Sequence, residues 1–172
     1  MSADPPGGPE TGDASPGIAL RHMALTQSPA ERGARPSAQA PHCFAVVLDW
    51  NLEGAADGER LTASIYAGHD GSASLYTTGS FGIVGGEGHD GIREAARRAV
   101  EGSQGQWAEA RSVLEYPYPE GTAFHAYLIG FDGVRRLTGD FEELCEAEER
   151  HPLFGLFDAM QQVLTLLREA HG

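Results

Sequence analysis

The sequence of 172 residues contains no lysine, and all twelve of its basic residues are arginine. A Schiff-base lysine, a phosphate-loop lysine and a lysine general base are therefore excluded. Twenty-five acidic residues outnumber the arginines, which gives a formal net charge of −13 at neutral pH. Because affinity for nucleic acid and for anionic lipid depends on basic residues that neutralise phosphates, we expect neither nucleic acid nor a membrane as a partner.

Cysteine is scarce, and long apolar runs are missing. Only Cys43 and Cys145 are present, without the CxxC spacing of redox or zinc sites, so we interpret them as two reduced, partly buried thiols. The apolar patches at residues 18–20 and 23–25 are interrupted by Arg21 and His22, and are too short for a signal peptide or a membrane span. We therefore expect a soluble, cytoplasmic protein.

Catalytic signatures are also missing, since the chain has neither GxSxG nor HExxH. His125 lies in a predicted strand beside Tyr127 and could serve as a general base, but a lone histidine in a strand is more often structural. The sequence therefore favours a non-enzymatic protein without a cofactor.

Prolines divide the chain into two parts. Seven of the ten lie at or before Pro41, and residues 1–40 have no sustained apolar period. Such a segment cannot bury enough surface to offset its conformational entropy. The sequence predicts a disordered N-terminal tail over residues 1–40 and a single domain over residues 41–172.

The domain opens with residues 43–50, where both alternating faces are mostly apolar, which predicts a central strand. A hairpin is predicted next, around residues 69–71. A two-residue turn would place apolar side chains opposite polar ones. A three-residue turn, with Gly71 in the left-handed conformation, pairs Ile65 with Leu75 and is therefore the predicted register.

This register leaves a row of hydroxyl-bearing side chains on the other face of the hairpin. Its members are Thr62, Ser64, Tyr66, Ser72, Ser74, Tyr76 and Thr78. Such a row is typical of the solvated side of a half-buried sheet. The functional interpretation is a flat polar docking surface, with Tyr66, Ser74 and Tyr76 as partner contacts.

Three helices are predicted. The first carries a narrow apolar stripe from Ile92 to Val100, with Asp90 as its N-cap. A second hairpin turns at Asp132-Gly133, while residues 106–121 fit a helical turn, a short strand around residues 113–116, or both. Asp140 begins a short acidic helix whose Phe141, Leu144 and Cys145 are expected to face inward. The last helix, after His151-Pro152, has a wide apolar stripe that suits a lid on the sheet.

The predicted order is three strands, a helix, two strands and two helices (βββαββαα). Adjacent hairpins imply an α+β fold, an antiparallel sheet of about five strands with helices packed on it. In element order, residues 43–170 resemble the profilin-like and roadblock families of interaction modules, a resemblance of topology without a shared motif. The alternative is an α/β fold with one βαβ unit.

Two glycine-rich motifs allow a second interpretation. Gly86, Gly88 and Gly91 form a literal GxGxxG before a helix, the outline of a dinucleotide site, although the acidic Glu87 and Asp90 would repel a pyrophosphate. The tetrapeptide GHDG occurs twice. Its members His69, Asp70, His89 and Asp90 are the candidate metal ligands of this alternative.

The densest negative patch is the run of Glu142, Glu143, Glu146, Glu148 and Glu149. The leading hypothesis is an acidic, non-catalytic interaction module of the immunity, inhibitor or regulatory-adaptor type, which binds a basic protein through this patch. The runner-up is a small enzyme or a nucleotide- or metal-binding domain that uses the glycine-rich loop at residues 82–91. A homodimer through an exposed sheet edge is a third hypothesis.

Overall fold

The computed structural model describes residues 15–52, 61–86 and 88–172. Its strands are β1 (Cys43–Leu52), β2 (Leu61–Gly68), β3 (Ala73–Thr77), β4 (Ile83–Val84), β5 (Arg111–Val113), β6 (Ala123–Gly130) and β7 (Gly133–Asp140). Its α-helices are α1 (Pro16–Thr26), α2 (Asp90–Ser103), α3 (Phe141–Ala147) and α4 (Phe154–His171).

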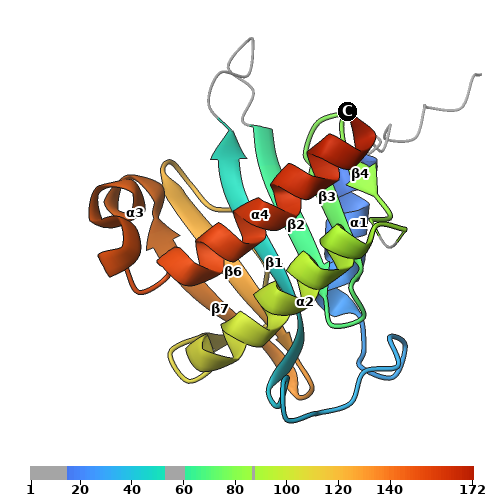
Figure 1. The fold of residues 1–172 in the computed structure, drawn as a ribbon. Coiled ribbons are helices and arrows are strands. Elements are labelled where there is room, and N and C mark those ends of the chain that lie inside the picture. Colours follow the sequence, from blue (N-terminus) through green and yellow to red (C-terminus); the bar gives the residue numbers. More distant parts are fainter. Residues whose placement is uncertain (1–14, 53–60, 87) are drawn as a thin grey trace, which may run out of the picture.

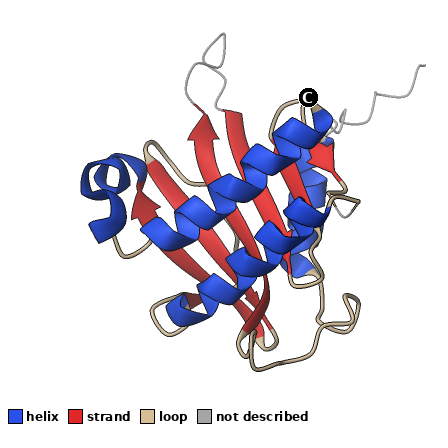
Figure 2. Cartoon of the chain, in the orientation of Figure 1, coloured by secondary structure: helices blue, strands red, loops and turns tan. Residues whose placement is uncertain are grey.

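The fold is α+β, and the strands form one sheet in the order β4-β3-β2-β1-β6-β7-β5. Every strand pair is antiparallel, so the alternative with a βαβ unit is wrong. The sheet has seven strands where about five were predicted, because β4 and β5 add a short strand at each edge. Helices α2 and α4 lie side by side across one face (Figures 1 and 2). We call this the α2/α4 face.

Strand β1 is the central strand, as predicted. It pairs with β2 on one side and with β6 on the other, and its first seven residues are buried. The predicted three-residue hairpin turn is also confirmed, because Ile65 pairs with Leu75 and Gly71 has a φ of 87°. The hydrophobic pattern of the sequence therefore predicted the register of this hairpin correctly.

The core on the α2/α4 face is made mostly of aliphatic and small side chains, with the rings of Phe124 and Phe157 packed on each other, their centroids 5.2 Å apart. The predicted stripe of α2, from Ile92 to Val100, is buried, and Met160 and Leu167 of α4 are fully buried against it. The prediction of Asp90 as the N-cap was wrong. Asp90 is the first residue of the helix, and His89 occupies the N-cap position. The alanines of α2 allow a close approach of the helix to the sheet.

The prediction of a disordered tail over residues 1–40 was wrong for Pro16–Thr26, which form helix α1. It packs on the opposite face of the sheet, with Ala24 and Leu25 buried, and we call this the α1 face. At Gly17 an added Cβ would lie 2.0 Å from the Thr77 carbonyl oxygen, so the helix backbone touches β3 directly. Residues 1–14 of the predicted tail lie outside the described residues. The helix was missed because tertiary contacts, rather than an apolar period, hold it.

The short acidic helix α3 starts where predicted, since the Asp140 side chain accepts hydrogen bonds from the backbone N–H groups of Glu142 and Glu143. Two of its inward-facing residues were predicted wrongly. Leu144 is buried, but Phe141 is 42% exposed and Cys145 is exposed. The helix extends past the β7 side of the sheet (Figure 1), and Leu144 is its one buried residue.

Candidate functional site

A buried ion pair joins α1 to the centre of the sheet. Arg21 and Asp49 are 5% and 0% exposed, and the Arg21 Nη2 atom lies 2.5 Å from Asp49 Oδ2. The Arg21 Nε atom donates to the same oxygen at 3.0 Å. A two-pronged arginine–carboxylate contact of this kind fixes both position and orientation. It determines where α1 lies on the sheet.

The same arginine also holds the extended segment that follows β5. Its Nη2 donates to the Tyr116 carbonyl at 2.9 Å, and its guanidinium lies 4.0 Å from the centre of the Tyr118 ring. The Pro117 carbonyl accepts from the Tyr127 hydroxyl at 2.6 Å and lies 2.9 Å from His125 Nδ1. One polar network thus connects α1, the sheet and the segment before β6.

Burial and charge set the protonation of this network. Burial raises the pKa of Asp49 above its ordinary value, and the hydrogen bond and charge of Arg21 oppose that shift. Desolvation lowers the pKa of His125, which favours a neutral ring. Since a carbonyl oxygen can only accept, the contact with Pro117 places the hydrogen of the neutral ring on Nδ1.

The predicted hydroxyl docking surface lies on this α1 face and is buried. Tyr66, Ser74 and Tyr76 are 2%, 7% and 7% exposed, so the expectation of a solvated face was wrong. The Tyr66 hydroxyl accepts hydrogen bonds from Gln27 Nε2 and Arg32 Nη2, both from the segment after α1. A partner therefore cannot contact these three residues while α1 and this segment are in place.

The five glutamates of the predicted acidic patch are all exposed, on α3 and on the short 3₁₀ turn Glu148–Arg150 that follows it. We call them the α3 acidic surface: Glu142, Glu143, Glu146, Glu148 and Glu149. None of them forms an ion pair with another described residue. From residue 140 to residue 150 the chain carries six acidic residues and one arginine, a net charge of −5.

An apolar cavity of about 250 Å³ lies beside the start of α3. Phe141 lines it together with Trp50 and Leu52 from the end of β1. Leu52 and Phe141 are 37% and 42% exposed, so the cavity presents apolar surface to solvent next to the carboxylates of the α3 acidic surface. Sequence analysis missed this feature because it assigned Phe141 to the core.

The glycine-rich motifs have separate local roles. The Asp70 side chain accepts from the backbone N–H of Ser72 inside the hairpin turn, and Asp90 pairs with Arg93 on the first turn of α2. His89 meets His171 edge to face, with ring centroids 6.1 Å apart. Across the part of the chain that the structure describes, no group of three or more His, Cys, Asp or Glu side chains could hold a metal ion.

The GxGxxG motif does not sit in the setting of a dinucleotide site. The strand before it, β4, is an antiparallel edge strand, and the chain after α2 enters the opposite edge of the sheet at β5. Gly86 packs closely on Ile92 and Leu167, whereas Gly88 and Gly91 have no neighbour within 4 Å of an added Cβ. Glu87, within the motif, lies outside the described residues.

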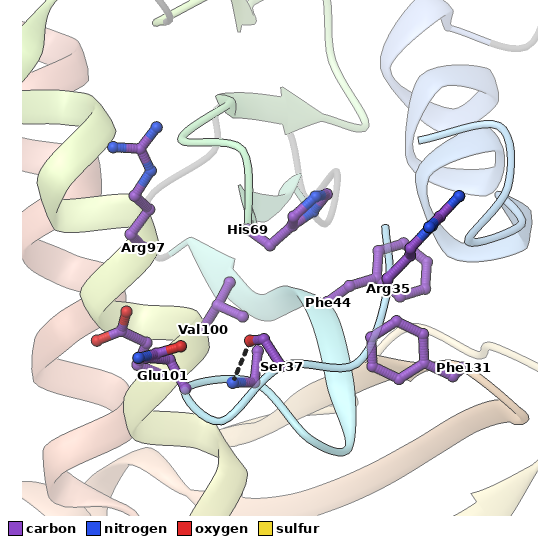
Figure 3. A pocket seen from close by; sticks show the side chains of 10 residues that line it. Arg35, Ser37, Phe44, His69, Arg97, Val100, Glu101 and Phe131 are labelled. Carbon is purple, nitrogen blue, oxygen red and sulfur yellow. Dashed lines mark hydrogen bonds between the residues drawn. The ribbon is translucent and has the colours of Figure 1, made fainter. Parts of the chain in front are cut away.

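A second cavity, of about 220 Å³, lies at the end of the sheet where β1 begins and β2 ends. Phe44 and Phe131 line it, and Phe131 belongs to the turn between β6 and β7. Figure 3 shows His69 between two arginines, Arg97 from α2 and Arg35 from the segment before β1. We call this cavity the Arg35 pocket. Of its side chains, sequence analysis singled out only His69.

Comparisons with protein-family models, with curated proteins and with solved structures found no match. No described helix is both long enough and apolar enough to cross a lipid bilayer.

Proposed function

We propose that this chain is a non-catalytic interaction module that binds a basic protein through the α3 acidic surface. The observation that carries the proposal is the placement of five exposed glutamates, none of them ion-paired with a described residue, on an element that extends from the sheet. A concentrated patch of one sign attracts partners of the opposite sign and speeds their association.

The burial of the hydroxyl row supports this assignment by removing the other predicted contact surface. Tyr66 and Tyr76 lie under α1 and the segment after it, whereas the α3 acidic surface is open to solvent.

The apolar cavity next to α3 suggests that the partner needs an apolar contact in addition to positive charge. Charged contacts at the rim of an interface favour encounter, but buried apolar anchors contribute most of the binding free energy. Phe141 and Leu52 offer such an anchor site beside the carboxylates. We therefore propose that the partner presents a large apolar side chain flanked by arginine or lysine.

The test replaces the five glutamates of the α3 acidic surface by glutamine and compares capture of proteins from the native cell lysate. A matched control neutralises five exposed acids elsewhere, namely Glu109, Glu115, Glu120, Asp158 and Glu169. We expect a partner that is retained by the wild type and by the control at low salt, and lost with the α3 variant. Equal retention by both variants would contradict the proposal.

A second variant, Phe141→Ala, separates the apolar contribution from the charged one. We expect it to weaken binding of the captured partner about tenfold or more, in the range of an interface anchor, without changing the salt dependence. The glutamine variant should instead flatten the salt dependence, because fewer charges are screened. A Phe141→Ala variant with unchanged affinity would remove the cavity from the proposed interface.

A further inference from the structure

We propose that the Arg35 pocket binds a small aromatic anion, a planar ring that carries one carboxylate or phosphate. This site is separate from the α3 acidic surface and does not depend on the function proposed above. The structure places two arginines that form no ion pair with a described residue beside aromatic side chains, in a chain whose net charge is −13.

Arg35 and Arg97 are two of the eight described arginines without an ion pair, and they differ from the other six in lining one cavity together. Arg21, Arg93 and Arg98 each lie within ion-pair distance of a carboxylate, on Asp49, Asp90 and Glu94. Arg35 and Arg97 have no such partner among the described residues, and Arg97 only donates to the Asp70 carbonyl oxygen at 3.4 Å. In a chain with a twofold excess of acids, two unpaired guanidinium groups around one cavity favour an anion there.

The remainder of the pocket selects the body of the ligand. Phe44 is 1% exposed and packs on Phe131 with ring centroids 5.6 Å apart, while the His69 ring meets Phe44 edge to face. Val100 of α2 adds an aliphatic wall. Aromatic side chains of this kind pair with another ring in stacked or edge-to-face geometry.

The size of the cavity limits the ligand. Its volume of about 220 Å³ is below the roughly 300–1,000 Å³ of pockets that take drug-sized ligands. A single ring with one anionic group suits this volume, whereas a dinucleotide does not. Among the described residues that line the pocket, Glu101 carries the one carboxylate, which would repel the ligand and reduce its affinity.

Benzoate and phenyl phosphate are the probes, with amide chemical shifts of the full chain as the readout. We expect saturable shifts at the amides of His69, Val100 and Phe131 with at least one of the two probes. Benzamide, which keeps the ring but lacks the charge, and inorganic phosphate, which keeps the charge but lacks the ring, should each bind about tenfold more weakly or worse. The two anionic probes distinguish a carboxylate ligand from a phosphate ligand.

Three variants test the residues. The double variant R35Q/R97Q should weaken binding of the better probe about tenfold or more, whereas R93Q/R98Q, which removes the same charge from ion-paired arginines, should leave it within about twofold. The variant E101Q should strengthen binding of the better probe, because it removes the carboxylate that repels the ligand. All five of these side chains are at least partly exposed, so the variants are expected to fold.

The proposal is overturned by no saturable shift with either probe, by shifts that map away from the pocket, or by equal effects of the two arginine pairs. Equal binding of benzamide would also overturn it, because the site would then recognise the ring alone.

Discussion

The two faces of the sheet are buried by different means. On the α2/α4 face, mainly aliphatic and alanine side chains, together with Phe124 and Phe157, fill the space between sheet and helices, and among the described residues no charged side chain is buried there. On the α1 face, tyrosines and hydroxyl groups surround an ion pair, Arg21–Asp49, at the centre of the sheet. The same strands contribute alternate residues to both.

The difference shows that a sheet face with many polar side chains need not be exposed to solvent. Apolar packing is non-directional and tolerates small shifts, whereas a buried ion pair stabilises only when both partners and their hydrogen bonds are in place. The α2/α4 face should therefore respond to substitution in proportion to the volume removed. The α1 face should respond to the loss of one partner far more than to the loss of both.

The largest expected effect is that of Asp49→Ala, because it leaves the Arg21 guanidinium buried without its carboxylate. Breaking a buried ion pair in this way costs about 3–5 kcal/mol, and urea unfolding of the full chain measures the loss. The double variant R21M/D49L replaces both charges by apolar side chains and should be more stable than Asp49→Ala. If the loss in unfolding free energy of R21M/D49L equalled the sum of the losses of R21M and D49L alone, the two side chains would not act as a unit.

On the opposite face, Met160→Ala tests apolar packing. Met160 is fully buried in α4, and truncating such a side chain costs about 2–5 kcal/mol. The volume-conserving Met160→Leu should cost less than about 1.5 kcal/mol. Similar losses for both variants would show that volume does not determine stability here.

A third prediction concerns the docking of α1. Gly17→Ala would drive a Cβ into the backbone of β3 at Thr77, and overpacking of this kind costs about 1–3 kcal/mol. Hydrogen exchange should then show faster exchange at Tyr66 and Tyr127, which α1 helps to shield. The control is Gly91→Ala in α2, where an added Cβ meets nothing within 4 Å and the change should be neutral or stabilising. Unchanged exchange at Tyr66 in Gly17→Ala would contradict this role of α1.

The smallest effect is a dependence of stability on pH that arises from His125. Because desolvation lowers its pKa in the folded state, the unfolded chain binds more protons once the pH falls below about 6.5, the ordinary value for histidine. The contribution of His125 to stability is thus complete above that pH and is lost as the pH falls. Denaturant titrations between neutral and mildly acidic pH should show a shallower decline for His125→Gln. Identical slopes would assign the decline to groups other than His125. Asp49 is not one of them, because its raised pKa makes its contribution to stability increase as the pH falls.

Much of the α2/α4 face could be predicted from the sequence, because periodicity reports directly on one-sided burial. The central position of β1, the pairing of Ile65 with Leu75 and the buried stripe of α2 all followed from it. The edge strand β4 did not, and for β5 the sequence left a helical turn and a short strand open, since runs of two and three residues contain no readable period. The inward direction of Phe141 was wrong because α3 lies beside the sheet and buries Leu144 alone of its residues.

The sequence did contain a signal for the α1 face, although its meaning depended on contacts distant in the chain. Asp49 is a charged residue inside an apolar strand, and Arg21 interrupts an apolar patch. Each taken alone argues against burial, yet a buried carboxylate needs a cationic partner, and the chain supplies one 28 residues away. Likewise, nothing local indicates that Arg35 and Arg97 line one pocket.

The sequence by itself determined the α+β class, the register of the first hairpin and the concentration of negative charge after β7, because these depend on local pattern and composition. Only the tertiary structure decided that the hydroxyl row is covered, that α1 belongs to the fold and that two unpaired arginines surround an aromatic-lined pocket. The physical reason is that a polar side chain can be buried only through a specific partner. The identity of that partner is a property of the folded chain.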